Sequence, residues 1–330
     1  MIHSVFESSA ASPAEASSAT HAEVRAARLF GLSVALAICG AVAVGVALRG
    51  GADSVSVTPG AGAGHLTLLG LHFSYPIVNL AAGVVLVLAA LGAAVVALAL
   101  RGVLRELRAS RTFARAMRAR NVRPRGDVFV FDDQRAQAFC AGLLRPRVYL
   151  STGAAALLPE DELRAVLAHE RGHRDRSDPL RIAFGRVIAR ALFFMPVLTR
   201  LHDRYCSIAE LAADDAAVRA SGGSPSVLAS AMLVFEGATH PDGSVGIAPE
   251  RVDHLLGRDV PSPLPLALAA IALASAVLIA LAAWQVGLAA TARATFNLPL
   301  LSTQPCIAML ALIPGALGAF AVGYLRRVAS

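Results

Sequence analysis

The stretch Leu163–Asp178, which reads LRAVLAHERGHRDRSD, decides the fold of this chain and points to its chemistry. It contains an H-E-x-x-H motif, in which His169 and His173 are four residues apart. On a helix this spacing places both imidazoles on one face, where they can bind the same metal ion. Glu170 lies about 100° round the helix from His169. It is therefore beside the metal but outside its ligand set, where a general base for a water molecule has to be.

The residues that flank the motif predict a helix. Pro159 suits a first helical turn, and the three acidic residues that follow it favour the positive end of the helix dipole. Leu163, Val166 and Leu167 then form an apolar face at helical spacing. The alternative is a pair of surface histidines on an ordinary helix, and the sequence downstream argues against it.

A second chemical stretch, Cys206–Val218, reads CSIAELAADDAAV and is rich in alanine, which predicts a helix. Its acids Glu210 and Asp214 are four residues apart and share one face. A catalytic zinc takes three protein ligands and leaves a fourth position for water, so Glu210 would complete a set with the two motif histidines. Asp214 is then placed to accept the outer N–H of a ligand histidine. The alternative is an ordinary charged helix face.

The composition predicts a membrane protein. The 330 residues are 56% hydrophobic and 16% charged, whereas an average soluble protein has roughly 25% charged residues. Any one apolar stretch could be a buried core helix, but four uncharged stretches are long enough to span a bilayer. These expected spans are residues 29–48, 77–100, 264–286 and 306–325, and residues 1–28 before them are expected to form a flexible tail.

The arginines predict the orientation of these spans. Arg25 and Arg28 precede the first span, a dense cluster follows the second, and two arginines follow the fourth. The loops after the first and third spans hold only Arg49 and Arg293. Because basic residues stay on the cytoplasmic side, both termini and the central region, residues 101–260, are expected to be cytoplasmic.

The central region begins with a basic helix, residues 101–125, which holds nine arginines and one glutamate. Its net charge of +8 exceeds the +7 of the whole chain, so the basic character belongs to this segment. We expect its arginine stripe to contact anionic lipid, at about 1 kcal/mol per arginine near the surface. A solvated face is the alternative. Direct binding of nucleic acid is not expected, because no recognised binding fold accompanies the stripe.

Two strand-like runs, Asp127–Phe131 and Arg147–Leu150, predict a small antiparallel sheet before the motif helix. Its edge could receive a substrate as an added strand, or the sheet could be purely structural. Residues 180–198 are apolar but hold three arginines, each costing about 2.5–3.5 kcal/mol at mid-bilayer. They predict an amphipathic helix over the site or at the membrane surface. The fold class is therefore an α+β membrane protein with a mainly helical H-E-x-x-H domain.

The central residues resemble a known family. The strings AFCAGLLRPRVYLSTG and LRAVLAHERGHRDRSDPL, followed by AELAADDAAV, are similar to the BlaR/MecR-type integral-membrane zinc metallopeptidases. HtpX-type heat-shock peptidases and CAAX-prenyl endopeptidases share both motifs and are the nearest alternative, although they usually place spans between the motifs. The chain departs from the BlaR/MecR pattern in having two spans before the domain and Arg171 inside the motif. With only five residues after the last span, a penicillin-sensing domain is not expected.

The resemblance implies a zinc endopeptidase at the cytoplasmic face of a bacterial inner membrane. One Zn²⁺ would be bound by His169, His173 and Glu210, with Glu170 as the general base. The implied substrate is a protein, either a transcriptional repressor or the chain itself, in regulatory proteolysis. The alternatives are quality control of membrane proteins and a non-catalytic membrane protein with a structural metal site.

Overall fold

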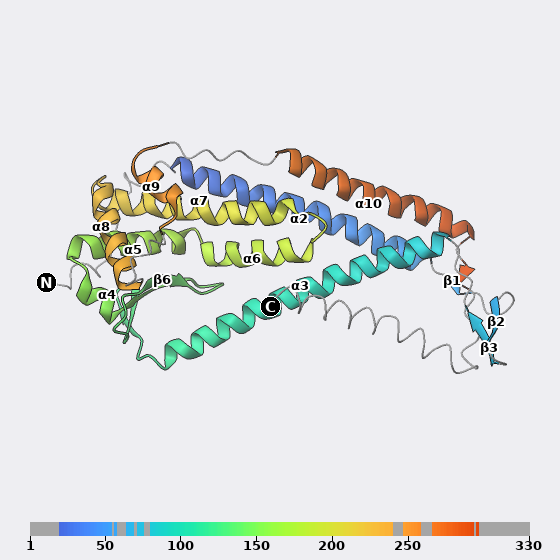
Figure 1. Ribbon diagram of the computed structural model, residues 1–330, viewed down its shortest axis with the longest axis horizontal. Coiled ribbons are helices and arrows are strands. Elements are labelled where there is room, and N and C mark those ends of the chain that lie inside the picture. The colour runs from blue at the N-terminus through green and yellow to red at the C-terminus, as the bar shows by residue number, and fades with distance from the viewer. Residues whose placement is uncertain are drawn as a thin grey trace. The chain divides into compact units, whose positions relative to one another are not determined.

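The protein is described by a computed structural model that covers residues 20–54, 56–57, 64–68, 71–75, 80–239, 247–258, 266–293 and 295–296 (Figure 1). It divides into two compact units. Unit 1 comprises Met1–Ala41 and Ala94–Ser275, and unit 2 comprises Val42–Ala93 and Ala276–Ser330. In unit 2, β1 (Ser56–Val57) pairs in parallel with β8 (Thr295–Phe296), and β2 (Gly64–Leu68) pairs antiparallel with β3 (Leu71–Tyr75). The candidate site lies wholly in unit 1.

Among the residues that the structure describes, two helices are long and apolar enough to cross a membrane. They contain the segments His21–Val46 of α2 (His21–Ser54) and Val87–Arg118 of α3 (Leu80–Arg118). Length and composition alone make this a weak indication of membrane association. Helix α10 (Leu266–Arg293) covers most of the third expected span. The fourth expected span, residues 306–325, lies outside the described residues, so the four-span architecture remains a prediction.

Helix α2 begins eight residues before the expected span. Thr20 and Glu23 form a capping box, in which each backbone N–H donates to the other residue's side chain, at 3.1 and 3.2 Å. This reciprocal pair satisfies two of the free N–H groups at the helix start. The helix therefore includes residues that the sequence assigned to the tail.

Helix α3 joins the second expected span to the basic segment without a break. Its six stripe arginines are all exposed, and they are Arg101, Arg105, Arg108, Arg111, Arg115 and Arg118. At 1.5 Å per residue, the last of them lies about 26 Å along the axis from the first. The expected contact of the stripe with anionic lipid remains a prediction, and beside the expected span 77–100 it would involve only the first turns of the stripe. The basic helix also ends earlier than expected, because residues 123–125 form a strand.

The sheet is mixed, so the expectation of an antiparallel sheet was wrong. Its strand order is β4-β5-β7-β6, from β4 (Arg123–Arg125), β5 (Val128–Phe131), β6 (Ala138–Ala141) and β7 (Arg147–Ser151). The central strands β5 and β7 run parallel, and both outer pairs are antiparallel. Strands β6 and β7 form a hairpin, and β7 occupies the position beside β5. The intervening β6 reverses the chain once more than the sequence analysis assumed, which makes β5 and β7 parallel.

The motif helix packs on this sheet. Helices α4 (Thr152–Leu157), α5 (Glu160–Asp175) and α8 (Pro225–Thr239) bury apolar side chains against β5 and β7. This core consists of Val128, Val148, Leu150, Ala154, Leu158, Leu163, Val166, Leu167 and Ala231. The apolar face predicted for the motif helix is thus its sheet-facing side, which leaves the histidines on another face.

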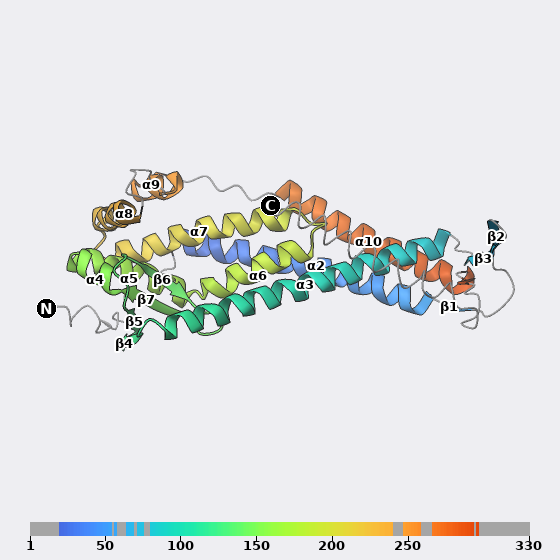
Figure 2. The same cartoon turned by 60° about the horizontal axis from the view of Figure 1, so that its bottom comes forward.

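The remaining helices of unit 1 extend away from the sheet. Helix α6 (Asp178–Ala191) and helix α7 (Val197–Ala220) form a helical hairpin, and the first half of α2 runs alongside it (Figures 1 and 2). Phe30 of α2 contacts the rings of Phe184 and Tyr205, at 5.9 and 5.8 Å between centroids. The short α9 (Pro249–Leu255) lies on α7.

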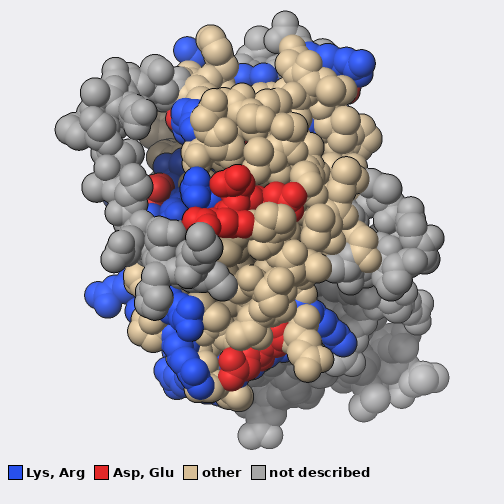
Figure 3. Space-filling view, turned by 90° about the vertical axis from the view of Figure 1, so that its left-hand side faces the viewer, with Lys and Arg blue, Asp and Glu red and all other residues tan. Residues whose placement is uncertain are grey.

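The surface charge of unit 1 is uneven. Seen from the end where α4 and α5 lie, acidic side chains gather near the middle of the face and arginines lie mainly around them (Figure 3). This pattern agrees with the sequence, in which the excess of arginine belongs to residues 101–125. The surface of unit 1 is therefore not uniformly basic.

Candidate metal centre

Helices α5 and α7 bring three ligand atoms together. The Nε2 atoms of His169 and His173 lie 3.2 Å apart, and the carboxylate oxygens of Glu210 lie 3.6 and 3.5 Å from them. All three ligand atoms are within 4.8 Å of one another. Two imidazoles and one carboxylate are the donor set of a catalytic zinc site with an open fourth position. The three predicted ligands thus fit a zinc ion, and the geometry agrees with both sequence motifs.

Small residues explain why α7 comes this close to α5. A Cβ at Gly172 would lie 3.3 Å from Cβ of Ala216 and 3.5 Å from Cα of Ala213, so a larger residue would push the helices apart. Ala212 and Ala213 are fully buried at the same contact. The alanines of the second motif therefore set the distance at which Glu210 reaches the histidines.

Asp214 stands behind His169, as the sequence predicted. Its carboxylate is fully buried, and one oxygen lies 3.0 Å from Nδ1 of His169. Nδ1 of His169 has no hydrogen-bond partner among the described residues, so the expected hydrogen bond is not formed and the contact with Asp214 is electrostatic. Arg251 of α9 donates two hydrogen bonds to the same carboxylate and lies 3.4 Å from Glu210. Sequence reasoning missed Arg251, because nothing in its local pattern ties it to the motif helix.

Asp178 stands behind His173 in the same manner, and sequence reasoning missed it too. Its fully buried carboxylate lies 2.8 Å from Nδ1 of His173 and accepts hydrogen bonds from Tyr205 Oη and Arg176 Nη2, at 2.6 and 2.8 Å. Arg176 also donates to the carbonyl of Ala209. The available signal was an aspartate five residues after the second motif histidine, at the start of the next helix.

Burial and the neighbouring charges have opposite effects on the pKa values at the site. Burial acts to lower the pKa of His169, but the carboxylates of Asp214, Glu210 and Glu170 outweigh it and raise the pKa to about 9. Burial acts to raise the pKa of Asp214 and Glu210, but His169 and Arg251 hold both below their usual values. The two acids are therefore ionised at neutral pH, which is the form that binds or supports a metal cation.

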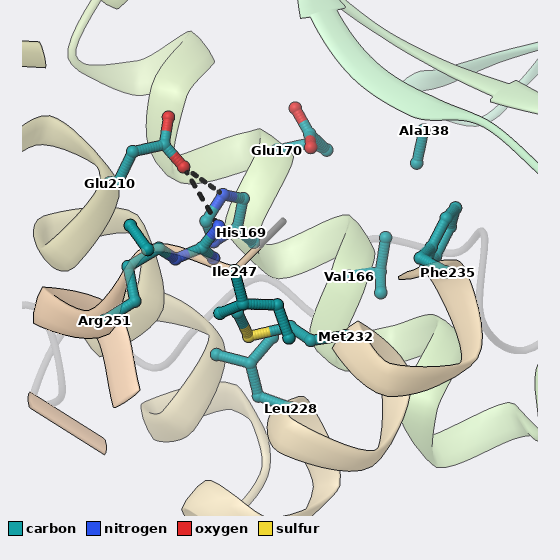
Figure 4. A pocket seen from close by; sticks show the side chains of 11 residues that line it. Ala138, Val166, His169, Glu170, Glu210, Leu228, Met232, Phe235, Ile247 and Arg251 are labelled. Carbon is teal, nitrogen blue, oxygen red and sulfur yellow. Dashed lines mark ion pairs between the residues drawn. The ribbon is translucent and has the colours of Figure 1, made fainter. Parts of the chain in front are cut away.

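Glu170 faces a cavity of about 340 Å³ together with His169, Glu210 and Arg251 (Figure 4). The other wall of this cavity is apolar and consists of Ala138, Val166, Leu228, Met232, Phe235, Ile247 and Ala248. A second cavity of about 540 Å³ shares Glu170 and the ligands, and it is bordered by residues 139–142 of β6 and the following turn. Glu170 thus borders both cavities, which leaves room for a peptide beside it.

Comparison with known proteins gives a match to a family of peptidases. Residues 104–235 match the model of peptidase family M48. No curated protein matches the chain. The M48 match covers less than half of the chain, but it contains the whole of α5 and of α7, and hence the three candidate ligands and Glu170. It indicates a metallopeptidase, and members of M48 are zinc enzymes. The finer assignment to the BlaR/MecR type is not addressed by this match.

Arg171 is the motif residue that departs from the BlaR/MecR pattern, and it has a structural role in the region that matches M48. It donates two hydrogen bonds to Asp127, at 2.8 and 2.7 Å, and Arg174 donates a third at 2.6 Å. The hydrogen bonds from Arg171 outweigh the effect of burial and, with those from Arg174, lower the pKa of Asp127 to about 2. The arginine points away from the metal ligands, toward the start of β5, so it is compatible with the site.

Proposed function

We propose that the protein is a membrane-anchored zinc metalloendopeptidase that cuts proteins at the cytoplasmic face of a bacterial inner membrane. The observation that carries this proposal is the convergence of His169, His173 and Glu210, with Glu170 beside them. A structural zinc site usually has four protein ligands and no need for an adjacent carboxylate. The three-ligand arrangement therefore favours catalysis over a structural metal site.

In this proposal the two motif histidines and Glu210 hold the zinc. When bound, zinc supplies Lewis-acid chemistry that polarises the scissile carbonyl and makes water more acidic. Glu170 accepts a proton from the attacking water and delivers it to the leaving amine, acting first as general base and then as general acid. Asp214 and Asp178 hold the imidazoles with Nε2 directed at the ligand position.

The cavities beside Glu170 fit an extended peptide. Strand β6 is an edge of the sheet; its first residue, Ala138, borders the first cavity, and residues 139–142 border the second. A substrate can therefore add to this edge through backbone hydrogen bonds while it passes the catalytic residues. The apolar wall formed by Leu228, Met232 and Phe235 favours an apolar side chain next to the cut.

The membrane address is proposed from the sequence and the contacts of α2. The distribution of arginine predicts cytoplasmic termini and a cytoplasmic peptidase region. Tyr205, which donates to Asp178, contacts Phe30 of α2, and Phe30 is the second residue of the first expected span. The metal centre is thus connected to the point where the span begins, which supports a site close to the membrane surface.

The cellular substrate is proposed to be a regulatory protein, either a transcriptional repressor or the chain itself. Broad removal of damaged membrane proteins is the alternative. Comparing new protein termini between cells with the wild type and cells with Glu170→Gln separates the two roles. A few defined cuts support regulation, and many cuts in unrelated membrane proteins support quality control.

The test of the enzymatic proposal is Glu170→Gln in the full-length protein. We expect zinc content and thermal stability to stay near wild-type values, while proteolysis of a protein substrate falls at least 10²-fold, a rough figure for the loss of a general base. Glu160→Gln is the matched control, because Glu160 lies on the same helix in an exposed ion pair with Arg164. Unchanged cleavage by Glu170→Gln would refute the role of this residue.

A further inference from the structure

The turn between α6 and α7 is strongly apolar. Between Arg190 and Arg200 the chain has nine uncharged residues, ALFFMPVLT, which we call the tip, residues 191–199. Leu192, Met195, Val197 and Leu198 are buried against their neighbours, whereas Phe193 is 52% exposed. An exposed phenylalanine at the end of a helical hairpin suits contact with an apolar partner better than contact with water.

The contact between the tip and helix α2 gives one estimate of the depth of the tip below the expected membrane boundary. A Cβ at Gly40 would be 2.8 Å from Sδ of Met195 and 3.1 Å from Cδ1 of Leu192, so the tip packs directly on this position. The stretch 29–48 is bracketed by Arg28 and Arg49, which fixes its place in a bilayer. Gly40 is eleven residues into that stretch, which corresponds to about 16 Å of helix.

Helix α3 gives a second, independent measure. A Cβ at Gly102 would be 3.3 Å from Val187 of α6, and Arg101 is the first charge after the uncharged stretch 77–100. Val187 therefore lies near the membrane boundary. Leu192 is five residues further along α6, about 7.5 Å deeper. In both ribbon views α6 lies beside α3, in agreement with the contact between Val187 and Gly102 (Figures 1 and 2).

The charges on the hairpin are compatible with insertion of the tip between them. Arg181 lies over the ring of Phe30, 5.3 Å from its centroid, and Arg186 pairs with Glu106 at 2.9 Å. Arg190 and Arg200 are exposed on the two flanks of the tip. Their long side chains can extend back toward the headgroups while the tip lies deeper.

We propose that the tip of the α6–α7 hairpin enters the hydrocarbon region of the bilayer and that Phe193 contacts lipid chains. The contacts with α2 and α3 place the tip between about 8 and 16 Å below the membrane boundary. The inference rests on the proposed membrane location, because both depths are read from spans in α2 and α3. The occupant of this apolar surface is therefore lipid, and the hairpin that carries Glu210 and Asp178 is anchored at both of its ends.

The experiment uses tryptophan quenching in vesicles. Trp284 is the single native tryptophan, so Trp284→Phe gives a silent background in the full-length protein. Phe193→Trp then reports on the tip, and lipids brominated midway along their chains quench tryptophan that lies in the hydrocarbon region. Ile38→Trp, at a 58% exposed site on α2, is the positive control, and Leu157→Trp, 47% exposed at the α4 end, is the negative control.

We expect Phe193→Trp to be quenched about as strongly as Ile38→Trp and Leu157→Trp to be unaffected. Quenching of Ile38→Trp without quenching of Phe193→Trp would overturn the inference and leave the membrane location intact. Absence of quenching at Ile38 would refute the membrane location of α2, and the inference with it. Phe194→Trp provides a second reporter if circular dichroism shows that Phe193→Trp is misfolded.

Discussion

Each of the two candidate ligand histidines has a buried aspartate behind it, and the two aspartates are held in place by different partners. Asp178 is held by Arg176 and Tyr205 within the α5–α6–α7 core, whereas Asp214 is held by Arg251 from α9. Helix α9 has seven residues, none of them buried, so it is held on α7 through the ion pairs of Arg251, His254 and Glu250 and not through a buried apolar contact. The difference shows that two aspartates in equivalent positions at a metal site can depend on very different parts of the fold for their placement.

Asp178→Asn tests the aspartate that is held within the α5–α6–α7 core. Of the three aspartate variants, it should cause the largest loss of stability. The change leaves the largely buried Arg176 guanidinium without its carboxylate and weakens the bonds to His173 and Tyr205. We expect a loss of about 3–5 kcal/mol in the free energy of unfolding, the usual cost of an uncompensated buried charge. Zinc affinity should fall about 10–100-fold. Chemical unfolding and competition with a chelator measure the two effects, and wild-type stability would contradict the proposed support.

Asp214→Asn tests the aspartate that is held by Arg251 of α9. Zinc affinity should again fall about 10–100-fold, since the carboxylate behind His169 loses its charge. The loss of stability should be smaller, about 1–3 kcal/mol, because Arg251 can move out with α9 and become solvated. Hydrogen exchange should increase in α9 and stay unchanged in α6. A loss of stability equal to that of Asp178→Asn would remove the distinction between the two supports.

Asp127→Asn serves as the comparison outside the metal centre, and its effect should be the smallest. Its pKa of about 2 is below the ordinary value of 3.8, so its contribution is complete above pH 3.8 and is lost as the pH falls toward 2. The wild type should therefore lose stability across that interval, and the variant should lose less. Partial exposure limits the effect to about 1 kcal/mol or less. Acid titration of unfolding measures it, with zinc affinity unchanged.

Much of the site could be predicted because it depends on helical periodicity. The spacing of His169 and His173, and of Glu210 and Asp214, is set within single helices, so it is legible in the sequence. The strand directions were not predictable in the same way. The parallel pairing of β5 with β7 depends on where β6 lies, and a period-two pattern fits either direction.

The sequence alone predicted the three candidate metal ligands, the candidate general base Glu170 and the stretches that are apolar enough for a bilayer. These properties follow from residue type and local spacing. Tertiary structure alone decided that Asp178, Arg176, Tyr205 and Arg251 complete the centre, and that Met195 lies beside Gly40. Those contacts arise from the packing of α6, α7 and α9 on one another and on α2. No local pattern encodes them, because each partner is brought in by a different helix.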